Sequence, residues 1–161
     1  MKLCRCREIA GAEDLAHALA IRRRVFVEEQ NLFVWSDWDE HDLEAIHLVA
    51  EVAGRIVGTV RLYAEEGDVW VGGRLAVLPE YREGVGSALV RRAVAEAEER
   101  QARAFIAWVQ EQNRGFFVRL GWRAIGETVL KYGREHVFME APLMGAGVPA
   151  NGRWHCPAEA E

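Results

Sequence analysis

Apolar residues at the start of the chain change from a strand-like to a helix-like spacing. Near-alternation over residues 2–9 predicts a strand. From Glu13 to about Glu28, apolar side chains recur at intervals of three and four, which indicates one buried face of a helix. These side chains are Leu15, Ala18, Ile21 and Val25. The chain is therefore expected to open with a strand and an amphipathic helix.

Three apolar runs follow a long polar loop at residues 30–44 and predict three strands. They cover residues 45–52, 55–64 and 69–78. Gly54 marks a turn between the first two runs, so these two strands are expected to pair as a hairpin. Pro79 ends the third run.

The second half of the chain returns to a helical pattern before three more strands. A helix is expected over residues 85–100, with its inner side formed by Leu89, Val90, Ala93, Val94 and Ala97. The elements predicted after it are a buried strand at 104–109, a short helix at 112–120 closed by Gly121, and strands near 122–130 and 134–141. From Gly145 the chain turns to glycine, proline and small polar residues. This predicts one domain over residues 1–144 and a mobile or loosely docked tail over residues 145–161.

The order of these elements predicts an α+β fold. A hairpin-built antiparallel half is joined to one strand–helix–strand crossover, which brings a parallel pair into the sheet. We therefore expect a mixed, mostly antiparallel sheet with helices on both of its faces.

Composition narrows the classes of function without naming one. The chain has 161 residues, 50% of them hydrophobic, and a formal net charge of −5. No apolar run approaches the roughly 20 residues that cross a bilayer, and an acidic chain is an unlikely general nucleic-acid binder. The first residues lack the apolar stretch of a signal peptide, so a cytoplasmic protein without nucleic-acid or membrane partners is expected.

Cysteine usage does not indicate a disulfide framework or a metal centre. Cys4, Cys6 and Cys156 cannot all pair with one another. A site made of these thiols and His155 would match no common zinc pattern and would require the chain ends to meet. We predict reduced thiols and no bound metal.

Two runs of charge have competing interpretations. The arginines at positions 22–24 are expected to lie on a solvated helix face. Residues 28–44 hold seven acids and no lysine or arginine, and the acids are Glu28, Glu29, Asp37, Asp39, Glu40, Asp42 and Glu44. They form either a solvated acidic loop or an electronegative mouth that attracts a cationic amine.

The sharpest local pattern is a strand, a glycine-bearing turn and a helix within residues 74–89. Backbone N–H groups at a helix N-terminus favour an anion such as a phosphate. A dinucleotide fingerprint would need a third glycine where Leu89 stands, and a P-loop would need a lysine that is missing. A turn that only caps the helix is the alternative.

The run over residues 74–82 followed by Gly84-x-Gly86 resembles the acetyl-CoA-binding motif of the GNAT N-acetyltransferases. The resemblance extends over residues 2–141. It includes residues 24–30, 39–42, His47 and 116–122, and is most like a bacterial subgroup associated with nitrogen-starvation gene clusters.

This resemblance implies a donor site on the strand and loop of the motif. The strand at Leu75, Ala76 and Val77 would splay from the next strand near Trp108, and the pantetheine arm would pair with its backbone. The pyrophosphate would lie on amides of Arg82, Glu83, Gly84, Val85, Gly86 and Ser87. A backbone N–H on the fourth strand would stabilise the charge that develops on the carbonyl oxygen.

Three positions depart from the pattern of the family. Tyr81 stands where the phosphate loop usually has Arg or Gln, so the loop is one residue short. Phe117 occupies the place of a tyrosine that protonates the departing thiolate in many members. Gln110 falls at the position of a frequent asparagine, and Asn113 lies nearby, so either amide is expected to contact the cofactor.

The acceptor side is expected around the end of the first helix. Glu29 is the first candidate for the general base, followed by His47. Trp38, Asp39 and His136 are candidates for contacts with the acceptor, and Trp35 is another aromatic residue that could line the pocket.

Together these observations predict an acetyl-CoA-dependent N-acetyltransferase acting on a small-molecule or peptide amine, with homodimer formation left open. A non-catalytic acyl-CoA sensor is the alternative, motivated by Phe117 and the short loop. A pure interaction module is a third reading, and it would show no thermal shift with coenzyme A.

Overall fold

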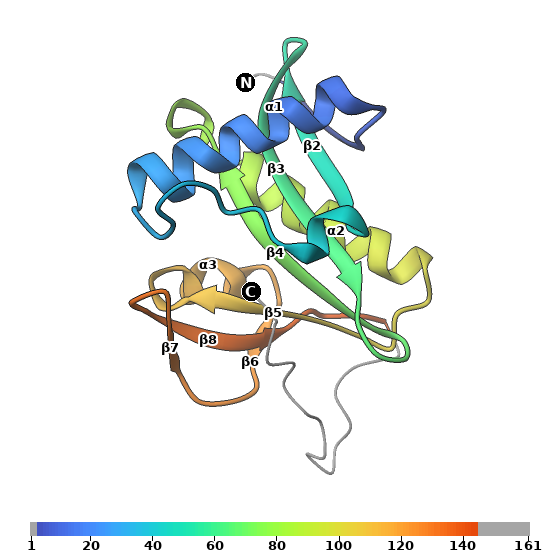
Figure 1. Cartoon of the computed structure of the whole chain (residues 1–161). Helices are drawn as coiled ribbons and strands as arrows, with labels where there is room; N and C mark the ends of the chain where they lie inside the picture. The colour runs from blue at the N-terminus through green and yellow to red at the C-terminus, as the bar shows by residue number, and fades with distance from the viewer. Residues whose placement is uncertain (1–2, 145–161) are drawn as a thin grey trace. The chain divides into compact units, whose positions relative to one another are not determined.

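The computed structural model describes residues 3–144. Their strands form one eight-stranded sheet in the order β1-β2-β3-β4-β5-β8-β6, with β7 paired to β8 (Figure 1). The strands are β1 Cys4–Glu8, β2 Ile46–Val52, β3 Arg55–Ala64, β4 Val69–Val77, β5 Ala104–Gln110, β6 Arg123–Ala124, β7 Val129–Lys131 and β8 Arg134–Glu140. The helices are α1 Ala12–Arg22, α2 Val85–Glu99 and α3 Arg114–Arg119. The mixed α+β architecture expected from the sequence is confirmed.

The described chain divides into two compact units. One unit comprises residues 3–62 and 74–93, and the other comprises residues 63–73 and 94–144. The domain boundary expected at residue 145 and the expected tail lie outside the described residues. Among residues 3–144, no helix has both the length and the apolar character required to cross a bilayer.

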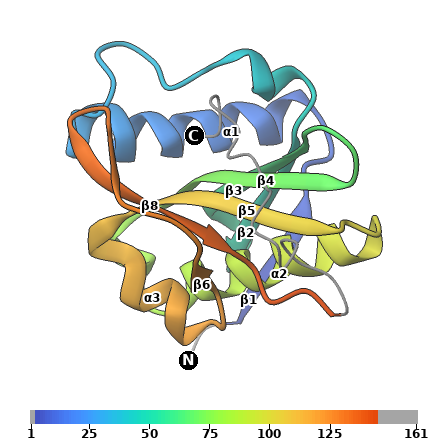
Figure 2. The same cartoon turned by 90° about the horizontal axis from the view of Figure 1, so that it is seen from below.

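The first unit is an antiparallel sheet covered by a helix on each face. Strands β1 and β2 pair antiparallel, and β2 and β3 form the predicted hairpin, with a register shift at Ala50/Glu51. Figures 1 and 2 show α1 on one face of β2 and β3 and the first turns of α2 on the other face. Leu48, Val57 and Leu89 are fully buried between these layers. Tight packing leaves no room at Gly58, where a Cβ atom would lie 3.0 Å from Leu89 Cδ1 and 3.3 Å from the backbone oxygen of Ala76.

The first helix continues beyond Arg22 in a different form. Residues Arg23–Glu29 make a π-helical turn that ends with Gln30 N–H donating to Val25 O at 2.9 Å. The predicted extent of the helix, to about Glu28, is therefore right, but a change of helical form was not foreseen. Val25 and Phe26 are buried by this wide turn.

The second unit is built around β5 and β8. Strand β5 runs parallel to β4 at Val69–Val71 and antiparallel to β8. Helix α3 is anchored through Phe117, whose ring meets Trp122 edge-on, and Trp122 in turn contacts Phe105 of β5. The single strand expected near residues 122–130 is wrong: the chain forms the two short strands β6 and β7, both paired to β8.

Candidate active site

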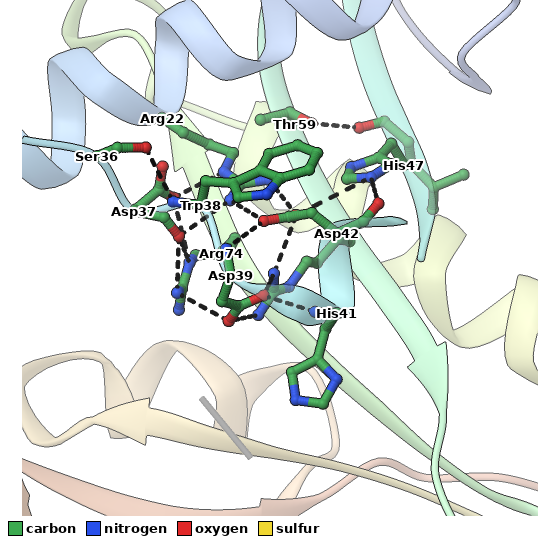
Figure 3. Close-up of polar contacts among 12 residues, drawn as sticks. Arg22, Ser36, Asp37, Trp38, Asp39, His41, Asp42, His47, Thr59 and Arg74 are labelled. Carbon is green, nitrogen blue, oxygen red and sulfur yellow. Dashed lines mark hydrogen bonds and ion pairs between the residues drawn. The ribbon is translucent and has the colours of Figure 1, made fainter. Parts of the chain in front are cut away.

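Six charged side chains form a compact ionic group in the first unit, which we name the arginine–aspartate cluster (Figure 3). Its members are Arg22, Arg61 and Arg74 with Asp37, Asp39 and Asp42. Arg22 is the last residue of α1, Arg61 lies in the centre of β3, and Arg74 lies in β4. The aspartates all come from the segment between α1 and β2. The cluster therefore ties this segment to three separate elements.

Each arginine in the cluster contacts two aspartates. Arg22 Nε lies 2.7 Å from Asp37 Oδ2, and Arg22 Nη1 lies 2.7 Å from Asp42 Oδ1. Arg61 donates to both carboxylate oxygens of Asp39, at 2.6 and 2.8 Å. Arg61 Nη1 also lies 3.0 Å from Asp42 Oδ1. Arg74 Nη2 lies 2.9 Å from the backbone oxygen of Asp37 and 3.2 Å from Asp39 Oδ2. Bidentate pairs of this kind fix geometry as well as charge.

The cluster keeps the carboxyl groups of Asp39 and Asp42 ionised despite their burial. Burial alone would raise the pKa of Asp42, but hydrogen bonds from Arg22 and the nearby guanidinium charges hold that pKa below its usual range. The pKa of Asp39 is lowered in the same way, because its pair with Arg61 outweighs the effect of burial. Each arginine of the cluster therefore contacts at least one of these two ionised carboxylates.

This arrangement corrects two expectations. Arg22 is 1% exposed, so the arginines at positions 22–24 do not share one solvated face, although Arg23 and Arg24 are exposed. Asp37, Asp39 and Asp42 are paired with internal arginines, so these acids form neither a solvated loop nor an electronegative mouth. The exposed acids of this segment that have no place in the cluster are Glu28, Glu29, Glu40 and Glu44.

Local hydrogen bonds explain why the segment folds as it does. Asp39 begins a 3₁₀ turn over Glu40–Leu43, where its side chain accepts from His41 N–H at 3.0 Å. Asp42 accepts from Asp39 N–H at 3.0 Å, which completes a capping box. The same two carboxylates thus cap a turn and bind arginines. Trp38, which directly precedes Asp39, is 41% exposed.

His47 lies inside the first unit and does not face solvent. It is 4% exposed, and its Nε2 lies 3.0 Å from the backbone oxygen of Asp42. Burial lowers its pKa, which keeps the imidazole neutral at neutral pH. This environment fits a residue that supports the aspartate segment, and it argues against the expectation that His47 is a base for an acceptor.

Glu29 and Arg82 form an ion pair that joins the two halves of the expected site. Arg82 Nη1 and Nη2 donate to the two oxygens of Glu29 at 2.8 and 2.7 Å, and Arg82 Nε donates to Val77 O at 3.1 Å. The hydrogen bond from Arg82 lowers the pKa of Glu29. Both side chains remain open to solvent, with 37% of Glu29 and 43% of Arg82 exposed. These contacts use three of the five N–H donors of the guanidinium, and the backbone amide of Arg82 is a further donor for a phosphate.

The glycine loop between β4 and α2 has the backbone form that an anion site needs. Gly84 has φ +89°, and the space where its Cβ would lie has no described atom within 4 Å. Helix α2 starts at Val85, and Ala88 N–H is bonded to Gly84 O. By helix geometry the amides of Val85, Gly86 and Ser87 have no intrahelical acceptor.

Strand β4 changes its backbone form just before the segment Leu75–Val77. Arg74 has φ +54°, in the left-handed region that side chains disfavour. Leu75 is half-buried, whereas Ala76 and Val77 are buried. This conformational change directly precedes the three residues expected to bind pantetheine.

The remaining candidates belong to the second unit. Gln110 ends β5, Asn113 precedes α3, and Phe117 is a buried side chain of α3 that packs edge-on against Phe116. His136 lies in β8, is buried, and places Nδ1 3.0 Å from Arg134 O. The part of the chain that the structure describes contains no gathering of His, Cys, Asp and Glu suited to a metal ion.

The sequence analysis missed the arginines of the cluster as site residues. A usable signal was present, because Arg61 and Arg74 stand within apolar strand runs, where a charge needs a buried partner. The acids of residues 37–42, which have no lysine or arginine near them in sequence, were the complementary half of that signal.

Comparison with known proteins gives the family of this fold and motif. Residues 12–122 match the model of the acetyltransferase (GNAT) family. A Bacillus subtilis (strain 168) protein named "Putative acetyltransferase BSU40680" is 32% identical over 139 residues, covering 83% of this chain and 92% of that protein. An acyl-CoA N-acyltransferase from Pseudomonas aeruginosa is 25% identical with a TM-score of 0.75, covering 88% of this chain and all of that one.

A more distant structure extends the likeness of fold. An aminoglycoside 6'-N-acetyltransferase solved with coenzyme A is 15% identical with a TM-score of 0.70, and the alignment covers 84% of this chain and 95% of that one. The family match covers more than half of the chain, and it includes β4, the glycine loop and α2. The chain therefore belongs to the GNAT acetyltransferase family, whose members transfer an acyl group from acyl-CoA to an amine.

Proposed function

We propose that this protein transfers an acetyl group from acetyl-CoA to the amine of a small molecule or peptide, by direct attack in a ternary complex. The observation that carries the proposal is the glycine loop. Gly84, with φ +89°, leads into a 15-residue helix whose first amides are directed outward. Such a helix start favours a phosphate, and acetyl-CoA brings a pyrophosphate together with an activated acetyl thioester.

The residues of the loop fit this donor. The open space at the Cβ position of Gly84 allows a close approach of phosphate oxygens to the backbone. In the proposed complex, the pyrophosphate lies on backbone amides from Arg82 to Ser87, and the pantetheine arm pairs with Leu75, Ala76 and Val77. Roles for Gln110, Asn113 and Phe117 at the donor remain predictions.

The reaction needs a neutral amine, because the nitrogen lone pair forms the new bond. The amine nitrogen bonds to the acetyl carbon, the carbon–sulfur bond breaks, and the nitrogen loses one proton while the departing sulfur gains one. Backbone N–H groups of β4 supply a preorganised donor for the negative charge that develops on the carbonyl oxygen. Phe117 has no proton to give, so the thiolate takes its proton from water.

Glu29 is the proposed base. Of the two candidates, Glu29 is exposed to solvent, whereas His47 is buried and bonded to the backbone. Arg82 keeps Glu29 ionised, so the carboxylate is ready to accept a proton, directly or through a water molecule. Trp38 and His136 remain candidates for contacts with the acceptor, while the pairing of Asp39 removes most of the support for a cationic one.

A non-catalytic acyl-CoA sensor is the second candidate. Phe117 supports it, because this side chain is part of the aromatic packing of α3 and cannot act as an acid. The likeness to the nitrogen-starvation subgroup also belongs to the proposal and rests on the sequence motifs. A cytoplasmic location belongs to it as well and rests on the apolar patterning and the cysteine usage of the chain.

Turnover with a panel of amines separates the two candidates. Release of free thiol from acetyl-CoA is followed together with mass detection of the acetylated product. An enzyme releases thiol in proportion to product, whereas a sensor stabilises on binding acetyl-CoA and releases none beyond the background. A protein with neither turnover nor a thermal shift would contradict both.

A further inference from the structure

The left-handed conformation in β4 falls on a residue where it is unfavourable. Gly72 and Gly73 directly precede Arg74 and would adopt positive φ freely, yet the conformation with φ +54° is at the arginine. A strained backbone persists only where its surroundings enforce it, and it is a reason to look for a function. The side chain of Arg74 is therefore the feature to explain.

The guanidinium of Arg74 is held from several directions (Figure 3). Nε and Nη2 both donate to the backbone oxygen of Asp37, at 3.1 and 2.9 Å, and Nε lies 3.2 Å from Asp37 Oδ2. Nη2 also donates to Asp39 Oδ2, and the group lies 4.9 Å from the ring centroid of Phe33. Arg74 is 6% exposed, so water does not replace these contacts. The segment from Phe33 to Asp39 thus fixes the position of this side chain.

Stability does not account for such an arrangement. Desolvation of buried ion pairs offsets much of their attraction, so a cluster of this kind adds little to the free energy of unfolding. The positive φ of Arg74 acts against folding as well. What the contacts do provide is a defined direction for the chain as it leaves two flexible glycines and enters Leu75–Val77.

We propose that Arg74 is a positioning residue for acyl transfer, whose clamped guanidinium sets the direction of the Leu75–Val77 backbone that receives the thioester. The inference rests on the proposed function, because it assumes that acetyl-CoA binds to this segment. The residue acts through the backbone and not by contact with the reacting atoms. Its effect is therefore expected mainly in kcat.

Two matched variants test the inference. Arg74→Lys keeps the charge but loses the forked contact, and Arg7→Lys makes the same change at a half-buried arginine outside the cluster, whose guanidinium contacts Asp14 and Glu51. We expect both variants to lower the melting temperature. Arg74→Lys should lower kcat at least tenfold, with less than a threefold change in the KM for the amine and in the calorimetric Kd for acetyl-CoA. Arg7→Lys should keep kcat within twofold of the wild type.

A third variant distinguishes the effect of the backbone conformation at residue 74 from the effect of its side-chain contacts. Glycine adopts φ +54° without strain, so Arg74→Gly permits the native backbone but no longer enforces it. We expect its kcat to be as low as that of Arg74→Lys. A wild-type kcat in Arg74→Gly would overturn the inference, as would equal losses of kcat in Arg74→Lys and Arg7→Lys.

Hydrogen exchange tests the same point without turnover. The amides of residues 75–77 should exchange at least tenfold faster in Arg74→Lys than in the wild type, and at the wild-type rate in Arg7→Lys. Equal exchange in the two variants would contradict the positioning role. A wild-type protein that acetylates no amine counts against the proposed function alone, because this comparison needs no activity.

Discussion

The ion pair between Glu29 and Arg82 decides how the proposed base is tested. Replacement by Gln keeps the shape of Glu29 and removes its charge and its basicity. We expect Glu29→Gln to lower kcat/KM for the amine about a hundredfold, because general-base catalysis typically contributes that much or more. The Kd for acetyl-CoA should remain within threefold, since the pyrophosphate is proposed to bind backbone amides.

The matched variant for this measurement is Arg82→Gln. It removes the partner of Glu29 and leaves the carboxylate in place. In this variant the pKa of Glu29 should rise towards that of an ordinary glutamate. The low-pH limb of kcat/KM should therefore lie at higher pH than in the wild type. A Glu29→Gln variant with full activity and altered acetyl-CoA affinity would show that Glu29 serves only to hold Arg82.

The buried histidine His47 and the cluster aspartates Asp39 and Asp42 make the stability of the fold depend on pH, each in its own pH range. Burial lowers the pKa of His47 below its usual value near 6.5, so stability is fully present above pH 6.5 and declines as the pH falls towards the pKa of the folded state. Asp39 and Asp42 also have lowered pKa values, and their contribution is lost only below about pH 4. Thermal denaturation of the wild type should show a loss between pH 7 and pH 5.5 that His47→Gln lacks. Equal losses in both proteins would mean that His47 does not titrate differently on folding.

At the scale of elements, Gly58 fixes how closely α2 approaches the sheet. A methyl group there would lie 3.0 Å from Leu89 Cδ1 and 3.1 Å from Val85 Cγ1, both on α2. Gly58→Ala should therefore lower the free energy of unfolding by about 1–3 kcal/mol. It should also weaken acetyl-CoA binding, because Val85 begins the helix that carries the proposed phosphate site. Gly126→Ala is the control, since the described atom nearest to its added Cβ is Phe138 Cβ at 4.0 Å, and it should change neither quantity appreciably.

The start of α2 can be tested by adding a charge. Gly86→Asp would bring a carboxylate to the amides that are proposed to bind the pyrophosphate, and like charges repel. We expect this variant to lose most of the thermal stabilisation by acetyl-CoA. Gly11→Asp adds the same charge at the N-cap of α1 and should keep the wild-type shift. If Gly86→Asp keeps it too, the loop does not bind the pyrophosphate.

Elements with a long apolar pattern in the sequence were predicted better than short ones. The strands over 46–52, 55–64 and 69–77 and helix α2 were predicted closely, because each carries a sustained apolar period. The strands in the region 122–131 were not predicted correctly, because β6 has two residues and β7 has three, which is too few to show alternation. The π-helical turn left no sequence signal either. The cluster was missed because its partners lie up to 37 residues apart in the chain.

For the whole molecule, acetyl-CoA is expected to act as a stabilising ligand. A ligand that binds only the native state adds about 2.7 kcal/mol at a hundredfold excess over Kd. The melting temperature should rise with acetyl-CoA concentration in line with the Kd from calorimetry. A shift with acetyl-CoA and none with coenzyme A of equal concentration would contradict a site built on the phosphates.

The arginine–aspartate cluster also constrains the order in which the chain acquires its structure. Its contacts join residues separated by 15, 20, 22 and 35 positions, so no short fragment contains a complete set of partners. Closing such loops has an entropic cost that is recovered only when the distant partners meet. The segment at residues 37–42 therefore becomes ordered only after the end of α1, β3 and β4 have come together. The loop expected to face the acceptor is thus among the last parts of the first unit to form.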